Sequence, residues 1–239
     1  MIFDDGRGRL GPMTDLRASF EVRTGVTTTA HRLAAAFPRM LEGYWVPEPL
    51  APLVSARADA SVNRRSDEEV LLLANGRWAR PDEGPDLEEG EAWVEQATGD
   101  VICAVLRRAD ALALLEGGDL PDRVRVAESP ERRLYRHPWD VLPDIRATIT
   151  HDIERMPVDN EALVARDVAA VVGDAPVQVH RSAVIGAGVV LDATDGPILV
   201  QEGAAIRHGA VLIGPCSIGR RSIVADRSII KSGTSIGPE

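Results

Sequence analysis

The sequence has very little lysine. Lys231 is the only lysine among 239 residues, so arginine carries almost all of the positive charge. Arginine stays charged and grips phosphate through two nitrogen atoms, but it does not serve as an amine nucleophile or form a Schiff base. Pyridoxal-phosphate chemistry is therefore excluded for the first 230 residues.

Cysteine, basic charge and long apolar runs are also scarce. The two cysteines, Cys103 and Cys216, are too few for a disulfide framework and fit no metal-binding spacing. No apolar run approaches the roughly 20 residues that a membrane helix needs, and the N-terminus does not have the form of a signal peptide. The net charge of −10 argues against a general nucleic-acid binder. We expect a cytoplasmic protein that binds neither membranes nor nucleic acid.

The last sixty residues repeat with a period of six. Ten aliphatic residues, which we call the anchors, keep this step except at residues 192–197, where three extra residues are inserted. Small or β-branched residues follow four positions after each anchor, apart from Asp195 beside the insertion. A period of six fits a short strand plus a turn, stacked coil on coil, and three such hexapeptides make one coil. The anchors are Val179, Ile185, Leu191, Val200, Ile206, Leu212, Ile218, Val224, Ile230 and Ile236.

This pattern resembles the hexapeptide-repeat left-handed β-helix found in many acyltransferases. The alternative is a β-rich sandwich with accidental spacing, which ten anchors in phase argue against. We expect the β-helix over 177–239 and a linker at 157–176 that contains a helix over 159–172. The sequence ends one anchor into a third coil with no capping segment. A solenoid needs such a cap, so we expect this chain to be part of a longer protein.

Residues 1–156 show no repeat and predict an α/β domain of short strands and helices. Thr27–Thr29 offers an N-cap for a helix over 30–37. An apolar run at 70–74 ends at Asn75-Gly76 and predicts a buried strand followed by a turn. The remaining expected elements are a strand at 2–3, a hairpin formed by 91–96 and 101–106, and helices at 109–115 and 145–153.

A glycine-rich segment at residues 6–11, Gly-Arg-Gly-Arg-Leu-Gly, follows the first expected strand. Backbone N–H groups of such a loop can converge on a phosphate whose charge arginine neutralises. The segment matches neither a Walker A loop nor a dinucleotide-binding fingerprint. A flexible polar turn remains the alternative on these residues alone.

The segment continues through Leu10-Gly-Pro-Met-Thr-Asp-Leu-Arg17 to Val22-Arg23-Thr-Gly25. Further on come Leu73-Ala-Asn-Gly-Arg77 and His137-Pro-Trp-Asp140, the latter before a helix that contains Asp152. In this order the motifs resemble a divergent bacterial family, the alternative bifunctional UDP-N-acetylglucosamine diphosphorylase/glucosamine-1-phosphate N-acetyltransferases. The resemblance covers nearly the whole chain. It implies a nucleotidyltransferase domain of the glycosyltransferase-A-like α/β type at 1–156, followed by the β-helix.

Such a domain joins a nucleoside triphosphate to a sugar 1-phosphate, and the resemblance implies UTP, N-acetylglucosamine 1-phosphate and release of pyrophosphate. Catalysis of this kind is mostly positioning and charge stabilisation. Related domains carry a lysine shortly after the loop, and this one has none, so either Arg17 or Arg23 substitutes or that step is impaired. The alternative role of Arg17 and Arg23 is a surface ion pair. Asn75 and Gly76 are candidates to contact the base or sugar, with a plain turn as the alternative. The expected triphosphate contacts are Asp5, Gly6, Arg7, Gly8 and Gly11.

Magnesium would need one or two carboxylates, and the candidates are Asp4, Asp5 and Asp140. Asp140 has an alternative role as a helix cap. Acetyl transfer from acetyl-CoA is expected only in a longer chain, because the later coils that carry the catalytic histidine in relatives are missing here. His180 and His208 occupy different positions of the hexapeptide and predict surface imidazoles.

Two other readings of the sequence stay open. One is a catalytically degenerate domain that binds a sugar nucleotide on an oligomerising β-helix. The other keeps only acyl transfer, with the N-terminal half as a substrate adaptor. Related β-helices pack side by side as trimers, so the resemblance implies a homotrimer.

Overall fold

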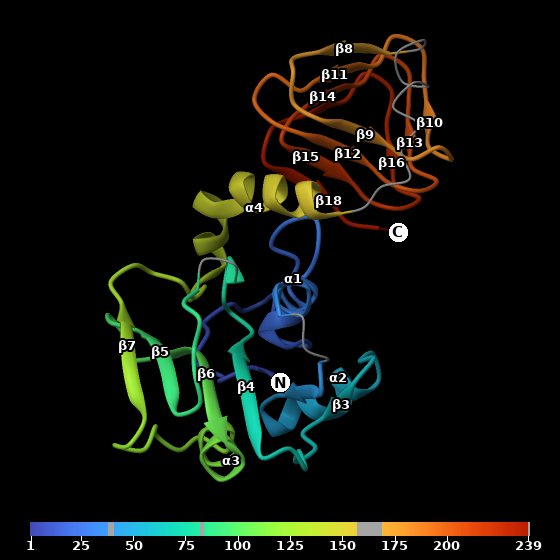
Figure 1. The fold of residues 1–239 in the computed structure, drawn as a ribbon. Helices are drawn as coiled ribbons and strands as arrows, with labels where there is room; N and C mark the ends of the chain where they lie inside the picture. Colours follow the sequence, from blue (N-terminus) through green and yellow to red (C-terminus); the bar gives the residue numbers. More distant parts are fainter. Residues whose placement is uncertain (38–40, 82–83, 157–168, 239) are drawn as a thin grey trace. The chain divides into compact units, whose positions relative to one another are not determined.

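The computed structural model describes residues 1–37, 41–81, 84–156 and 169–238. The chain forms two units, each considered by itself (Figure 1). Unit 1 comprises residues 1–23 and 28–141, and unit 2 comprises residues 24–27 and 142–239. Within the described ranges, no helix combines the length and the apolar character needed to cross a membrane.

Unit 1 is built on a seven-stranded mixed sheet with strand order β3-β2-β1-β4-β6-β5-β7. The first four strands in this order run parallel to one another, β6 is antiparallel to both β4 and β5, and β5 and β7 are parallel. The strands are β1 Ile2–Phe3, β2 Gly43–Trp45, β3 Ser61–Val62, β4 Val70–Asn75, β5 Glu91–Glu95, β6 Val101–Arg107 and β7 Arg125–Ser129.

Short helices connect these strands, and the elements expected from the sequence are present. The first helix begins after Thr28, whose hydroxyl accepts a hydrogen bond from the backbone N–H of His31. This is the usual way in which threonine satisfies a free N–H group at a helix start. The strand at β1, the hairpin β5–β6 and the helix after β6 are likewise confirmed. The helices are α1 Thr29–Ala36, α2 Ala51–Ser55, α3 Arg108–Leu115 and α4 Val141–Arg155.

Neighbouring residues on one strand pack on opposite faces of the sheet, because side chains alternate along a strand. In β2, Tyr44 belongs to the apolar cluster that contains Leu33 of α1 and Val54 of α2. Trp45 packs instead against the cluster that contains Leu115 of α3. The α1–α2 face and the α3 face of the sheet are therefore separate environments.

Unit 2 contains a parallel, three-sheet β-helix of the kind that the six-residue period predicts, in the form typical of a left-handed β-helix. Its core consists of the anchors together with small residues such as Ala204, Ala210 and Cys216. The three sheets have the orders β10-β13-β16, β17-β14-β11-β8 and β18-β15-β12-β9. The strands are β8 Ala170–Val172, β9 Val177–Val179, β10 Val184–Ile185, β11 Val190–Asp192, β12 Ile198–Val200, β13 Ala205–Ile206, β14 Val211–Ile213, β15 Cys216–Ile218, β16 Ile223–Val224, β17 Ile229–Ile230 and β18 Thr234–Ile236.

Strand register shows how the coils stack. Ile198 pairs with Cys216, eighteen positions later, which is three hexapeptides. Val184 pairs with Ala205, twenty-one positions later, because that coil contains the three inserted residues. The insertion lies at a corner where Gly196 and Gly214 meet, and a Cβ on Gly214 would lie 2.0 Å from the Gly196 carbonyl oxygen. Only glycine fits such a close approach of two backbones.

One expected element is wrong in part. Residues 159–168 of the helix expected over 159–172 lie outside the described residues, but Ala170–Val172 form strand β8 and not a helix. This strand pairs in parallel with β11, so residues 170–172 belong to a sheet of the β-helix and not to a linker. A short run of alanine and valine is compatible with either structure, and pairing with β11 selects the strand.

The helix expected over 145–153 is confirmed within α4, and the loop at residues 24–27 packs against it. The carboxylate of Asp152 accepts hydrogen bonds from the backbone N–H groups of Val26 (2.9 Å) and Thr27 (3.2 Å). Val26 also shares a buried apolar cluster with Ile153 of α4. These contacts explain why this short loop groups with unit 2.

Candidate functional site

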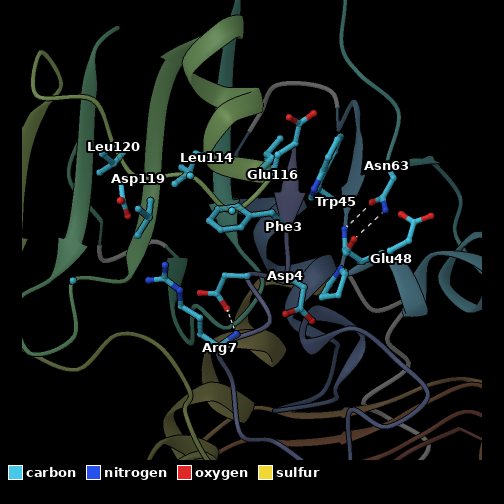
Figure 2. Close-up of a pocket in the computed structure, with 18 residues that line it drawn as sticks. Phe3, Asp4, Arg7, Trp45, Glu48, Asn63, Leu114, Glu116, Asp119 and Leu120 are labelled. Atoms are coloured by element: carbon cyan, nitrogen blue, oxygen red, sulfur yellow. Dashed lines mark hydrogen bonds between the residues drawn. The ribbon is translucent and has the colours of Figure 1, made fainter.

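A cavity of about 530 Å³ opens beside the carboxyl ends of β1, β2 and β3 (Figure 2). Its lining includes the residues that come directly after each of these parallel strands: Asp4 and Asp5 after β1, Val46 after β2 and Asn63 after β3. Open α/β sheets commonly bind ligands at this edge, where the chain leaves the sheet in different directions. Phe3 and Leu114 add an apolar wall on the α3 face.

Arg7 and two of the lining glutamates lie at separate ends of this cavity, which we call the strand-end cavity. Arg7 lies at one end, and in Figure 2 the carboxylates of Glu116 and Glu48 lie away from it, beside Trp45 and Asn63. A ligand with phosphate at one end and hydroxyl or N–H donors at the other matches this distribution, because carboxylates accept hydrogen bonds and guanidinium groups donate them.

The loop after β1 is shaped by the buried carboxylate of Asp4. One oxygen accepts from the backbone N–H of Gly6 at 2.9 Å, and the other accepts from Ser19 N–H at 2.7 Å. Gly6 has a φ of +66°, in the left-handed region that suits glycine. Asp4 thus folds the start of the loop sharply and ties it to residues 19–21.

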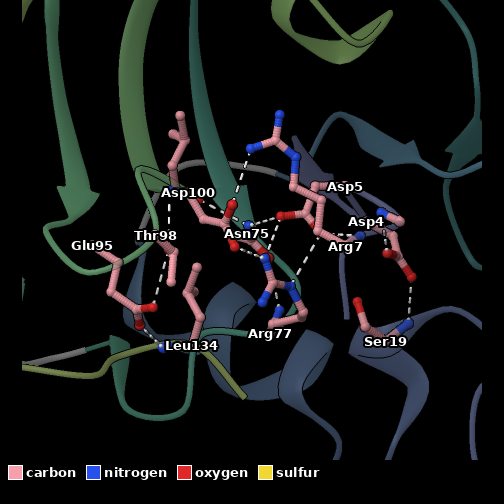
Figure 3. A network of polar contacts seen from close by, with 12 residues as sticks. Asp4, Asp5, Arg7, Ser19, Asn75, Arg77, Glu95, Thr98, Asp100 and Leu134 are labelled. Atoms are coloured by element: carbon pink, nitrogen blue, oxygen red, sulfur yellow. Dashed lines mark hydrogen bonds and ion pairs between the residues drawn. The ribbon is translucent and has the colours of Figure 1, made fainter. Parts of the chain in front are cut away.

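Asp5 is held by the buried guanidinium of Arg77 (Figure 3). Arg77 Nε lies 3.1 Å from Asp5 Oδ1, and Arg77 Nη2 lies 2.5 Å from Asp5 Oδ2. Oδ2 also accepts from the Asn75 side-chain amide at 2.9 Å, and Oδ1 accepts from the backbone N–H of Arg7 at 3.0 Å. Both oxygens of Asp5 therefore have two hydrogen bonds each within the protein.

Asp100, at the start of β6, joins the same network. Its Oδ2 accepts from Arg77 Nη2 at 2.8 Å, and its Oδ1 accepts from Arg7 Nη1 at 2.9 Å. Burial alone would raise the pKa of Asp100, but the hydrogen bonds and positive charges of Arg77 and Arg7 outweigh it, so its pKa is lowered. For Arg77, burial favours loss of the proton, yet Asp5 and Asp100 raise its pKa overall. Asp100 and Arg77 are therefore both charged at neutral pH.

The structure places only part of the predicted site in this cavity. Asp5 and Arg7 line it. Asn75 is fully buried and hydrogen-bonds to Asp5 and to the Val101 carbonyl oxygen, and Gly76 packs so tightly that a Cβ would lie 2.8 Å from Phe20. Both residues therefore have structural contacts within the protein, and contact with a base or sugar stays a prediction.

The other predicted glycines lie on the loop without lining the cavity. Gly8 passes close to Arg77, since a Cβ there would lie 2.8 Å from Arg77 Cδ. Gly11 is exposed, and a Cβ there would lie no nearer than 3.4 Å to the Asp15 carboxylate. Nucleotide binding by Gly6, Gly8 and Gly11 stays a prediction.

Arg17 lines a different cavity, of about 570 Å³, on the α1–α2 face of the sheet. Tyr44 is part of its lining, and burial together with the neighbouring carboxylate of Asp59 raises the pKa of this tyrosine to about 12. Arg7 and Arg17 therefore do not converge on one cavity. Arg23 is exposed and lines neither of the two cavities.

The carboxylates predicted to bind magnesium have other partners. Asp140 accepts hydrogen bonds from the backbone N–H groups of Arg136 (2.8 Å) and His137 (2.7 Å) and pairs with Arg132 at 2.6 Å. It caps the turn at Pro138–Asp140, as the alternative reading of the sequence proposed. Asp5 is saturated by arginine and amide donors. Neither carboxylate fits a magnesium ligand as it stands, and the part of the chain that the structure describes contains no group of three potential ligands.

The sequence predicts no role for two residues of the network. Arg77 is only the last residue of the Leu73–Arg77 motif, and Asp100 belongs to no motif. Their sequence signals are a charged residue in the turn after a buried strand and an aspartate at the tip of the β5–β6 hairpin. Both signals are common at ordinary turns, so neither predicts a network.

The histidines of the β-helix have separate local partners. His180 Nδ1 lies 2.8 Å from the Ser182 hydroxyl, and His208 Nδ1 accepts from the backbone N–H of Ala187 at 3.0 Å. The two imidazoles therefore contact different residues.

Comparison with known proteins identifies the N-terminal part of the chain. The family described as sugar nucleotidyl transferase matches residues 1–160, about two thirds of the sequence. A search of curated proteins found no match. The matched range contains the whole seven-stranded sheet, the strand-end cavity and the Asp5–Arg77–Asp100–Arg7 network. The chain belongs to the sugar nucleotidyl transferase family.

Proposed function

We propose that unit 1 joins a nucleoside triphosphate to a sugar 1-phosphate and releases pyrophosphate, with UTP and N-acetylglucosamine 1-phosphate as the substrates. The family match supports the reaction class. The strand-end cavity is the observation that supports a binding site for these substrates. It lies at the sheet edge where α/β proteins commonly bind ligands, and it has an arginine at one end.

In this reaction an oxygen of the sugar 1-phosphate attacks the α-phosphorus of the triphosphate. A new P–O bond forms to the sugar phosphate, the bond between the α- and β-phosphates breaks, and pyrophosphate leaves with the bonding electrons. The protein contributes mainly by holding both phosphates in line and by balancing their negative charge. We assign that charge balance to Arg7, which lines the cavity. A catalytic role for Arg17 and Arg23 stays a prediction from the sequence.

The far end of the cavity suits the donor-rich part of the substrate. Glu48 and Glu116 line it together with the indole of Trp45. Carboxylates accept hydrogen bonds from sugar hydroxyls or base N–H groups, and an aromatic ring stacks on a base or sugar face. The choice of uracil and N-acetylglucosamine rests on the resemblance of the sequence motifs.

Magnesium is proposed as the partner of the triphosphate. Mg²⁺ in phosphate-transfer sites is held largely by substrate phosphates and water. Asp5 and Asp140 hydrogen-bond to other groups of the protein, so the proposed reaction assigns neither carboxylate as a metal ligand.

The test is pyrophosphate release by this chain with UTP, N-acetylglucosamine 1-phosphate and Mg²⁺. The variants Arg7→Ala, Arg17→Ala and Arg23→Ala are each compared with Arg125→Ala, which alters an exposed arginine on β7. We expect release that requires the sugar phosphate, that falls about 100-fold in Arg7→Ala and that is unchanged in the control. Absence of release with every nucleoside triphosphate and common sugar phosphate would overturn the proposal.

A second candidate is a sugar-nucleotide-binding or adaptor domain without turnover. It is favoured by the absence of lysine before Lys231, because related domains carry a lysine near the loop. Binding of UDP-N-acetylglucosamine by a chain that releases no pyrophosphate would support it. Acetyl-CoA binding by a longer chain would support an acyltransferase with a substrate adaptor.

We also propose that the β-helix assembles as a homotrimer. Val184 and Ile223 point outward on the sheet β10-β13-β16, and Ile229 points outward on the adjacent sheet, each with more than 60% of its surface exposed. Exposed aliphatic side chains on two sheets of one β-helix suit side-by-side packing against further copies of the chain.

A further inference from the structure

Asp100 holds two arginines that differ sharply in exposure. Its Oδ2 binds Arg77, whose side chain is 1% exposed, and its Oδ1 binds Arg7, whose side chain is 56% exposed. Asp100 itself is buried, with 5% of its side chain exposed. One carboxylate therefore connects an immobile interior arginine to an arginine that borders the strand-end cavity (Figure 3).

The interior half of this arrangement is firmly fixed. The Arg77 guanidinium makes hydrogen bonds to Asp5 and to the Tyr135 carbonyl oxygen as well as to Asp100. The backbone N–H of Asp100 donates to the Thr98 hydroxyl at 3.1 Å, which closes the tip of the β5–β6 hairpin. Asp100 is thus held from both its backbone and its side chain, and its Oδ1 is a stationary acceptor.

Arg7 uses only one of its N–H groups to bind Asp100 Oδ1. A guanidinium has five N–H donors in a planar fork. Among the described residues, Arg7 Nη1 donates to Asp100 while Nε and Nη2 have no protein partner. Nε and Nη2 of Arg7 are therefore available to donate to a phosphate. Because the hydrogen bond to Asp100 already restricts the Arg7 side chain, it loses less rotamer freedom when a phosphate binds.

We propose that Asp100 is a positioning residue that orients Arg7 toward the phosphate of a bound nucleoside triphosphate, with Arg77 as the fixed counter-charge that keeps Asp100 in place. This inference rests on the proposed function for the identity of the ligand. Asp100 does not touch the substrate in this assignment; it acts through Arg7.

A double-mutant cycle on UTP binding tests the assignment. The dissociation constant of UTP is measured by calorimetry for wild type, Arg7→Ala, Asp100→Asn and the double variant. We expect Asp100→Asn to weaken binding about ten-fold, as for loss of a charged hydrogen bond. In the Arg7→Ala background the same change has less than a two-fold effect, because the group through which Asp100 acts is gone.

Asp110→Asn is the matched control. Asp110 is also a poorly exposed aspartate that pairs with an exposed arginine, Arg123, but neither residue lines the strand-end cavity. It should leave UTP binding unchanged. Arg7→Lys serves as a second probe that keeps the fold, because Arg7 is on the surface: it keeps the charge but has one nitrogen, so we expect weaker UTP binding, close to that of Arg7→Ala.

The outcomes separate this inference from the proposed reaction. Equal UTP affinity in wild type and Asp100→Asn, additive losses in the cycle, or wild-type affinity in Arg7→Lys would each overturn the positioning role. Coupled losses in a chain that releases no pyrophosphate would support the positioning role and refute the reaction. A wild-type chain that binds no UTP would refute both. In an active chain, Asp100→Asn should raise KM for UTP more than it lowers kcat.

Discussion

The guanidinium of Arg77 grips the carboxylate of Asp5 through two nitrogen atoms, Nε to Oδ1 at 3.1 Å and Nη2 to Oδ2 at 2.5 Å. The two residues lie 72 positions apart in the chain and meet because β1 and β4 are neighbours in the sheet. Two-nitrogen pairs of this kind are strong and geometrically specific. The pair fixes the start of the glycine-rich loop to the end of β4.

Removing the buried charge should destabilise unit 1. Arg77→Met leaves Asp5 and Asp100 without their shared counter-charge, and breaking a buried ion pair in this way costs about 3–5 kcal/mol. Arg77→Lys keeps the charge and should lie between wild type and Arg77→Met. Urea unfolding followed by tryptophan fluorescence reports this unit, because all four tryptophans lie between residues 45 and 139.

The exposed arginine at position 125 provides the comparison. It pairs with Glu91 on the surface, so Arg125→Met should leave the urea midpoint of unit 1 nearly unchanged. Equal urea midpoints for Arg77→Met and Arg125→Met would show that the Asp5–Arg77–Asp100 network does not stabilise unit 1.

Acid should weaken unit 1 through its lowered carboxyl pKa values. The folded-state pKa of Asp100 is below its ordinary value, and so is that of Asp140, where two backbone N–H groups and Arg132 outweigh the effect of burial. A lowered pKa contributes stability that is complete above the unfolded-state pKa of about 4 and is lost as the pH falls further. Melting temperatures from pH 6 to pH 2 should therefore fall steeply below pH 4, and less steeply in Asp140→Asn. Parallel curves for the two proteins would refute this linkage.

The sequence predicts the β-helix well because its period is local. Coils without the insertion repeat every eighteen residues, so the anchors and the small residues between them can be read along the chain without knowing the fold. The same reading fails at residues 170–172, where an apolar run precedes the first anchor and carries no period of its own. Pairing with β11, twenty positions later, decides its structure.

The site in unit 1 depends on contacts that no local pattern contains. The loop residues Asp5 and Arg7 could be singled out from the glycine-rich segment, yet their partners Arg77 and Asp100 are 72 and 93 positions away. Arg17 is only ten positions from Arg7, and it lines a cavity on the other face of the sheet. Sequence proximity therefore misleads about which charges converge.

The two loop glycines at positions 8 and 11 should respond differently to alanine. A Cβ at Gly8 would lie 2.8 Å from Arg77 Cδ, so Gly8→Ala should displace the guanidinium and lower the stability of unit 1. A Cβ at Gly11 meets nothing closer than 3.4 Å, so Gly11→Ala should fold normally. Urea midpoints compare the two variants. A loss of UTP binding in a stable Gly11→Ala would indicate that the triphosphate approaches this backbone, as predicted from the sequence.

Charge on the outward face of the β-helix should break the proposed trimer. The side chain of Ile223 is 68% exposed, so Ile223→Asp disturbs no core packing. The variant should lower the mass measured by light scattering from three chains to one while leaving the circular dichroism spectrum unchanged. Arg220→Asp, on the turn before the same strand, tests whether charge alone has this effect. A wild-type chain with the mass of a monomer would refute the trimer.

Glycine at one corner of the last complete coil should stabilise the β-helix. Arg227 has a φ of +58°, and the equivalent corner one coil earlier is occupied by Gly209, with a φ of +70°. The left-handed region costs a residue with a Cβ about 1 kcal/mol, whereas glycine adopts it freely. Arg227→Gly should therefore raise the calorimetric melting temperature of unit 2. Arg220→Gly is the control, because Arg220 is another surface arginine but its φ is not positive. At this position glycine relieves no backbone strain and only increases the freedom of the unfolded chain, so the melting temperature should fall. A melting temperature of Arg227→Gly at or below that of wild type would refute the relief of backbone strain at this corner.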